Sequence, residues 1–199
     1  MAQRGRDIIR CCARVWLRRY GAEMAKDSDS TLDECLAAVD AMLRMESAFE
    51  ASCDFLLACE LMGPRRNSEA VRKGTAHWPI RSYATCACLA LELALKARTS
   101  LDEKTPKKTH RFSALFAALS RPAQEDVAAG FVLDGQAATV PGLMEVLQLC
   151  DQTFDTWRYR HEHRDADFYE GHILAVTRAV HESILRLEPQ WRICQNLLS

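Results

Sequence analysis

The sequence predicts an all-α protein: an up-and-down four-helix bundle with an extra N-terminal helix and short connecting helices. Three observations indicate this fold class. Apolar residues recur at helical spacing along most of the chain. The 199 residues include only eight glycines and six prolines, and none of either between Gly21 and Gly63, which leaves room for long helices. No segment shows a convincing strand pattern, and no glycine-rich phosphate loop is present.

Composition and charge narrow the class further. Hydrophobic residues make up 48% of the chain and charged residues 27%, which is typical of a globular protein and excludes an intrinsically disordered one. A chain of this length needs neither a metal nor a disulfide for stability. The 26 basic and 27 acidic residues give a net charge of -1, so no global attraction to nucleic acid or to an anionic membrane is expected.

We expect two regions along the chain: residues 1–30, a basic N-terminal helix, and residues 31–199, the bundle. Ile8, Cys12, Val15 and Trp16 form an apolar stripe at helical spacing, and arginines lie largely off that stripe. The N-terminal residues contain no uninterrupted apolar region of the kind that secretory signals have. No apolar run reaches the roughly 18 residues of a membrane span. These features favour a cytoplasmic protein without membrane contact.

The second region begins with a capping signal. Thr31 and Glu34 form a capping box, so a helix is expected to start there and to run to Gly63-Pro64. The following segment, Gly63 to Pro79, reads as a polar loop. Ile80 to Arg98 is then the most buried helix candidate, because it is apolar on nearly every side.

The remaining elements follow from helix start and stop signals. Proline is favoured in the first turn of a helix and glycine just after its end. We expect a solvated connector at Thr99–Thr109, helices at His110–Leu119 and Pro122–Gly130, a turn at Leu133–Val140, and long helices at Pro141–Trp157 and Phe168–Leu187.

Two sets of polar residues are the candidate site. Glu92 and Lys96 lie one helical turn apart with the acid first, the favourable order for an ion pair. The segment Trp157 to Asp167 holds three arginines, two histidines and three acids. Arginine supplies donors for phosphate and histidine titrates near neutrality, so this segment has the chemistry for binding or cleaving RNA. A solvated helix end with the same residues is the alternative, and no metal site is expected.

The nine cysteines are an odd number and include no Cys-x-x-Cys, so a disulfide framework or a zinc site is not expected. Most lie on apolar helical faces, where a reduced cysteine packs as a small hydrophobic residue. Cys11 and Cys12 are the exception, as an adjacent pair that oxidation could link between chains.

The order of motifs resembles the HEPN superfamily of helical proteins over about residues 32–187. Many bacterial members carry a Glu-x-x-x-Lys on the second core helix, a His followed by a Leu-Phe-like pair, and an aromatic-Arg-Tyr before the last helix. Here the matching segments are Cys88–Lys96, Thr109–Phe116 and Phe154–Glu162.

This resemblance implies an all-α homodimer in which polar Arg/His segments of both chains line one cleft. Catalytic members carry an Arg followed a few residues later by a His, and act as metal-independent endoribonucleases in toxin–antitoxin, abortive-infection and CRISPR systems. Arg158 and His163, with four residues between them, meet that spacing. The residue after the Arg is usually Asn, Asp or His in nucleases, but here it is Tyr159. Arg-Tyr is similar to the non-nuclease branch, whose members accompany nucleotidyltransferases or bind small ligands.

Two functional hypotheses therefore stand. The first is a non-catalytic HEPN-like dimer that binds a nucleotide, RNA or a partner protein, with Glu92 and Lys96 holding Arg158 or Tyr159. The second is a metal-independent endoribonuclease in which Arg158 contacts phosphate and His163 transfers a proton. In both, the residues that shape the cleft are Arg160, His161 and Glu162. Neither requires a cofactor, and an antitoxin or a nucleotidyltransferase is the expected protein partner.

Overall fold

The computed structural model describes residues 32–63, 67–74, 79–102, 104–133, 135–151, 153 and 169–194. These residues form an all-α structure, which confirms the predicted fold class. The expected helix at residues 6–20, the predicted boundary after residue 30 and the Arg/His segment at 157–167 lie outside the described residues. The described elements are α3 (Leu32–Met62), α4 (Glu69–Arg72), α5 (Ile80–Leu101), α6 (Phe112–Phe116), α7 (Arg121–Gly130), β1 (Val132–Leu133), β2 (Gln136–Ala137), α8 (Val140–Cys150), α10 (Glu170–Leu187) and the 3-10 helix η2 (Pro189–Cys194).

The chain divides into two compact units, Met1–Arg44 and Met45–Ser199. In the first unit the described residues are the N-terminal part of α3, where exposed Asp40 and Arg44 form an ion pair of 2.6 Å across one helical turn. The second unit contains the rest of α3 and all the other described elements.

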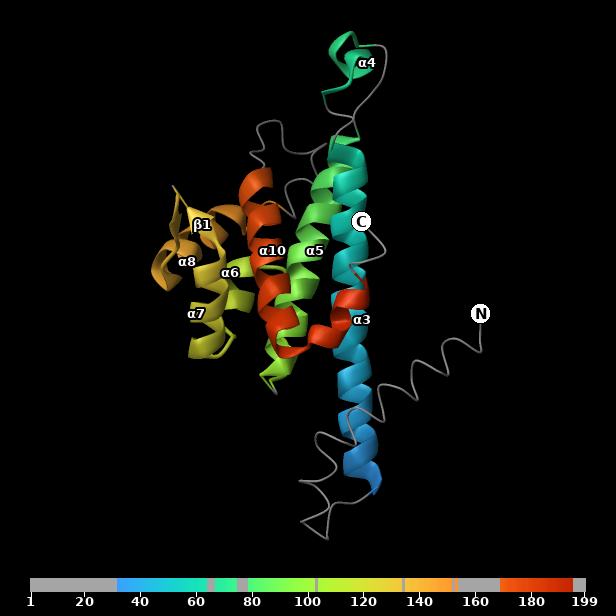
Figure 1. The fold of residues 1–199 in the computed structure, drawn as a ribbon, viewed down its shortest axis with the longest axis vertical. Coiled ribbons are helices and arrows are strands. Elements are labelled where there is room, and N and C mark those ends of the chain that lie inside the picture. Colours follow the sequence, from blue (N-terminus) through green and yellow to red (C-terminus); the bar gives the residue numbers. More distant parts are fainter. Residues whose placement is uncertain are drawn as a thin grey trace, which may run out of the picture. The chain divides into compact units, whose positions relative to one another are not determined.

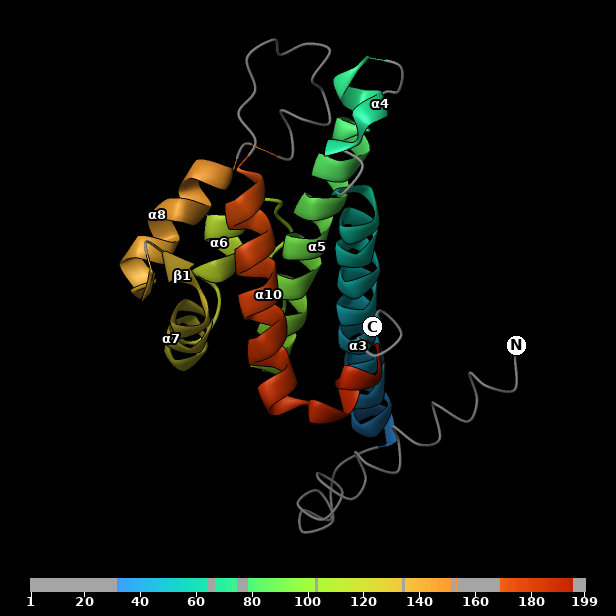
Figure 2. The same ribbon diagram turned by 45° about the horizontal axis from the view of Figure 1, so that its top comes forward.

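Within the second unit, α10 packs along α5 and, on another side, against α7 and α8 (Figure 1). The short helix α6 packs on both α5 and α8. The part of α3 from Met45 onward lies beside α5 on the side away from α7 and α8, as both views show (Figure 2). Helix α5 is therefore central, and twelve of its residues are buried. The core includes Phe49, Tyr83, Leu91, Leu95, Phe112, Phe116, Leu143, Leu147, Ile173 and Ile184.

Three predicted helices have the expected limits within a few residues, because their boundaries are marked by strong local signals. Ser120 caps α7 by accepting from Ala123 N at 3.4 Å. Thr139 caps α8 by accepting from Gly142 N at 3.2 Å. Both helices carry a proline in the first turn, where its missing N–H costs nothing.

Several local predictions were wrong. The helix expected at His110–Leu119 is shorter and spans only Phe112–Phe116. The polar loop after Gly63 contains the short helix α4, which Ser68 caps by accepting from Val71 N. The turn expected after Leu133 is an antiparallel hairpin of β1 and β2, with Gly135 at φ +79° between them. A glycine adopts this conformation without a steric penalty.

Candidate functional site

A buried carboxylate on α5 is the centre of the candidate site. Glu92 Oε1 accepts a hydrogen bond of 2.5 Å from Lys96 Nζ, and Glu92 Oε2 accepts one of 2.8 Å from His110 Nδ1. The Glu92 side chain is 5% exposed, against 26% for Lys96 and 59% for His110. Burying a carboxylate is tolerated when both its oxygens are paired in this way. The ion pair predicted between Glu92 and Lys96 is therefore present, and His110 joins it from a separate segment.

His110 lies in a basic stretch between α5 and α6, here called the basic connector (residues 104–111). It contains four cations, Lys104, Lys107, Lys108 and Arg111, besides His110, and it contains no acid. All five of these residues are exposed. No described acid pairs with the four cations of the connector. In contrast, described ion pairs engage Arg44, Lys73, Arg98, Arg121, Arg178 and Arg186.

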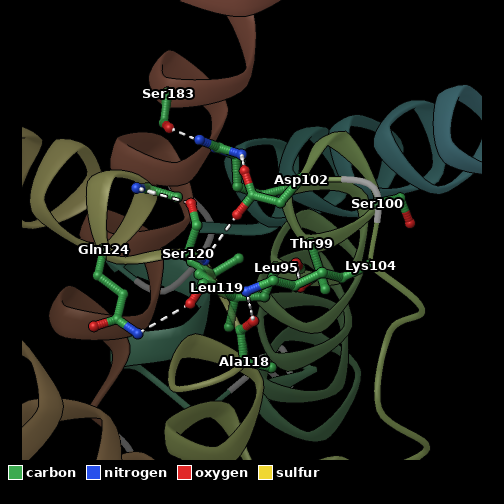
Figure 3. Close-up of polar contacts among 12 residues, drawn as sticks. Leu95, Thr99, Ser100, Asp102, Lys104, Ala118, Leu119, Ser120, Gln124 and Ser183 are labelled. Carbon is green, nitrogen blue, oxygen red and sulfur yellow. Dashed lines mark hydrogen bonds and ion pairs between the residues drawn. The ribbon is translucent and has the colours of Figure 1, made fainter.

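The beginning of the basic connector is fixed by a polar network at the end of α5 (Figure 3). Arg98 donates from Nε to Ser183 Oγ on α10 at 3.0 Å and from Nη1 to Asp102 Oδ1 at 2.7 Å. Asp102 Oδ2 accepts from Ser120 N at 2.8 Å, at the start of α7. Lys104 Nζ donates to the Ala118 carbonyl at 3.2 Å. The network joins α5, α7 and α10 immediately before the connector.

Asp102 titrates below its usual range as a result. Burial on its own raises the pKa of this carboxyl, but the hydrogen bonds from Ser120 and Arg98 and the charge of Arg98 outweigh burial and lower the pKa. Asp102 is therefore a stable anion that neutralises the buried Arg98 guanidinium.

The far end of the connector is fixed by a second carboxylate. Asp151, directly after α8, accepts from Ser113 N at 2.9 Å and from the Ser113 hydroxyl. This contact ties the start of α6, three residues beyond His110, to the end of α8. In the sequence, the Arg/His segment follows Asp151 after a few residues.

The six predicted site residues of that segment lie outside the described residues, so their predicted roles stay predictions. They are Arg158, Tyr159, Arg160, His161, Glu162 and His163. Sequence reasoning missed His110 as a site residue, although it stands in the Thr109–Phe116 motif that carries the HEPN resemblance. That motif was the available signal, because Glu92 and His110 are 18 residues apart and no helical spacing connects them.

A second polar pair is fully buried between α3, α5 and α10. Ser52 donates to the Ala90 carbonyl at 2.6 Å and lies 2.7 Å from His181 Nε2. Since the hydroxyl proton goes to the carbonyl, Nε2 carries the proton of the imidazole and donates to Ser52. Nδ1 of His181 then has no partner among the described residues. Burial lowers the pKa of His181 to about 4, so the ring is neutral. This pair has no access to solvent and is part of the core.

The described cysteines match the packing role predicted for them. Cys53, Cys59, Cys88 and Cys150 are buried with free thiols, and Cys86 is partly buried. Burial raises the pKa of Cys59 and of Cys150 to about 12, so neither forms a thiolate near neutral pH. Among the residues that the structure describes, no three His, Cys, Asp or Glu side chains are grouped so as to hold a metal ion.

Fold and site together define an all-α protein with a buried carboxylate clamp beside an exposed basic connector. No protein-family model, curated protein or solved structure matches the chain. None of the described helices is long and apolar enough to cross a membrane.

Proposed function

We propose that this chain is a non-catalytic, HEPN-like helical protein that binds a phosphate-bearing ligand, a nucleotide or RNA, and that two copies form a twofold dimer. The ligand site is the face formed by Lys96, His110 and the Arg/His segment. The observation that carries the proposal is the Glu92 clamp, which holds an ammonium and an imidazole on one buried carboxylate.

The clamp supports phosphate binding because it positions donors without consuming them. An ammonium group has three donors, and Glu92 accepts from one of those of Lys96. A side chain that is already held in place loses less conformational entropy when a ligand arrives. The nearby cations of the basic connector also leave the surroundings of the clamp positively charged, which favours an anion.

Ligand-induced stabilisation tests this proposal. A ligand that binds the folded state at about 100 times its Kd stabilises it by about 2.7 kcal/mol, so the melting temperature rises measurably. We expect nucleotides or a short RNA to raise the melting temperature of the wild type. The rise should shrink in Lys96→Gln, which keeps a donor for Glu92 but removes the charge, and in Arg158→Ala. The matched control is Arg121→Gln on α7, an exposed arginine that pairs with Glu125 and should bind ligand normally.

Three results would contradict the proposal. The first is the absence of a shift with any nucleotide or RNA, which would leave a protein partner as the ligand. The second is RNA cleavage in EDTA that His163→Ala abolishes while the variant stays folded, because the protein would then be a nuclease. The third concerns only the dimer: light scattering that shows a monomer at micromolar concentration would contradict the twofold association.

A further inference from the structure

We infer that the basic connector binds the phosphodiester backbone of a polynucleotide, so that the ligand is an extended chain and not a single nucleotide. This inference rests on the proposed function and adds to it a second contact surface and a mode of binding. Glu92 is a positioning residue in it, because its contact with His110 holds the connector against α5.

The first argument is the distribution of ion pairs. The chain as a whole is nearly neutral, with a net charge of -1. On the described surface, however, the acids neutralise cations on the helices, as Glu125 does for Arg121 and Asp126 for Arg186. The connector has four exposed cations and no described acid partner for them. Its charge is therefore available to an external anion, and a row of cations fits a ligand with repeated negative charges.

The second argument is that the connector is held in place at both ends although it is not helical. Lys104 is anchored to the Ala118 carbonyl, and His110 is anchored to Glu92. Pro106 restricts the backbone between these two anchors. The cations between the anchors are thus presented on a fixed path, and less ordering is needed on binding than for a free tail.

The residue types indicate how the polynucleotide is bound. Residues 104–111 include no Phe, Tyr or Trp, so they offer no ring of the kind on which bases usually stack. Three of the four cations are lysines, which act on phosphates as point charges without bidentate geometry. Contacts of this kind position a nucleic acid without reading its sequence. We therefore expect binding that is independent of sequence and strongly dependent on salt.

The experiment compares two double variants that remove the same charge. Lys107→Gln/Lys108→Gln removes two unpaired cations of the connector, and Arg121→Gln/Arg186→Gln removes two exposed cations that pair with acids elsewhere. Fluorescence anisotropy measures binding of a single-stranded RNA of roughly 16 nucleotides. A DNA of the same sequence, ATP and polyglutamate are tested in parallel over a range of salt concentrations.

We expect the connector variant to lose about 1.4 from the slope of log K against log salt, at about 0.7 per phosphate contact. Between roughly 50 and 200 mM salt the wild type should then lose about sevenfold more affinity than this variant. The control variant should keep the wild-type slope, and ATP should bind equally to all three proteins. Similar behaviour of RNA and DNA supports a backbone contact, and a preference for RNA supports the same contact with the ribose as a further determinant.

The inference is overturned if the connector variant keeps the wild-type slope, or if the control variant loses as much as the connector variant. It is also overturned if polyglutamate binds as tightly as RNA, since the partner would then be an acidic protein. Failure of the proposed function gives a different result. In that case ATP binds to neither the wild type nor Lys96→Gln, whereas failure of the connector inference leaves ATP binding intact and sensitive to Lys96→Gln.

Discussion

The buried imidazole of His181 predicts a specific loss of stability in mild acid. The ring is 1% exposed and lies between Ser52 and the ring of Phe49, whose centroid is 5.0 Å from its own. Protonation would place a hydrogen on Nδ1, which has no acceptor among the described residues. The folded protein therefore resists protonation, and the pKa falls from 6.5 to about 4 because of burial alone.

The sign and the size of the effect follow from this pKa. Between pH 6.5 and 4 the unfolded chain binds a proton at His181 that the folded chain does not, so stability rises with pH in this window and is lost as the pH falls. A full pKa unit corresponds to 1.36 kcal/mol. Relative to neutral pH, His181 should cost the folded state about 2 kcal/mol at a pH of about 5, and about 3 kcal/mol near pH 4.

The test is the replacement His181→Leu. This change removes the titrating group, and Ser52 keeps its hydrogen bond to the Ala90 carbonyl. Near neutral pH the two proteins should differ in free energy of unfolding by only about 1 kcal/mol, because one hydrogen bond and one unpartnered nitrogen are lost together. Urea denaturation at a series of pH values should then show the variant gaining about 2 kcal/mol on the wild type by about pH 5.

A control separates titration from packing. Val180→Ala creates a cavity in the core beside His181 but leaves the imidazole in place, so its free energy of unfolding should fall by a similar amount at every pH. If the difference between wild type and His181→Leu stays constant from neutral pH to about pH 5, the imidazole is not held neutral by burial and the reasoning fails.

Three further predictions concern the core and the network at the end of α5. Asp102→Asn should cost about 3 kcal/mol in urea denaturation because it leaves the Arg98 guanidinium buried without its partner, and a cost below about 1 kcal/mol would contradict this. Since the pKa of Asp102 is lowered from 3.8, its contribution to stability is present above that pH and lost below it, in a window more acidic than that of His181. Leu91→Ala should cost about 2 to 5 kcal/mol, because the side chain is completely buried. Cys150, whose pKa is raised to about 12 by burial and by Asp151, should react with a thiol reagent only after unfolding, and fast labelling of the native protein would contradict its burial.

The helices could be predicted from sequence because their signals are local. The segment that forms α5 is apolar on nearly all sides, and no chain position outside it is needed to see that it must be buried. The Glu92–Lys96 pair is equally local, since one helical turn separates the two residues. The hairpin was missed although Asp134-Gly135 is a strong turn signal, because the flanking strands have only two residues each and show no alternation to detect.

The polar contacts between elements could not be predicted, because they depend on how the helices pack. His110 reaches Glu92 from a different segment, and Ser52 reaches His181 across 129 positions of the chain. Each of these residues is unremarkable in its local sequence. His181 even looks like an ordinary surface histidine on a long helix, and only the packing of α3 and α5 against α10 makes it a buried one.

Net charge illustrates the same limit for function. A charge of -1 over the whole chain argues against global attraction to nucleic acid, and this conclusion depends on acids and bases being mixed evenly over the surface. The structure shows that they are not mixed evenly: acids pair with arginines on the helices, whereas residues 104–111 carry cations alone. At physiological ionic strength charges more than about 8 Å apart are screened from each other, so an approaching anion responds to the local group of cations and not to the total. A nearly neutral chain can therefore hold a strongly basic surface, and the ion pairs elsewhere are what leave this one unneutralised.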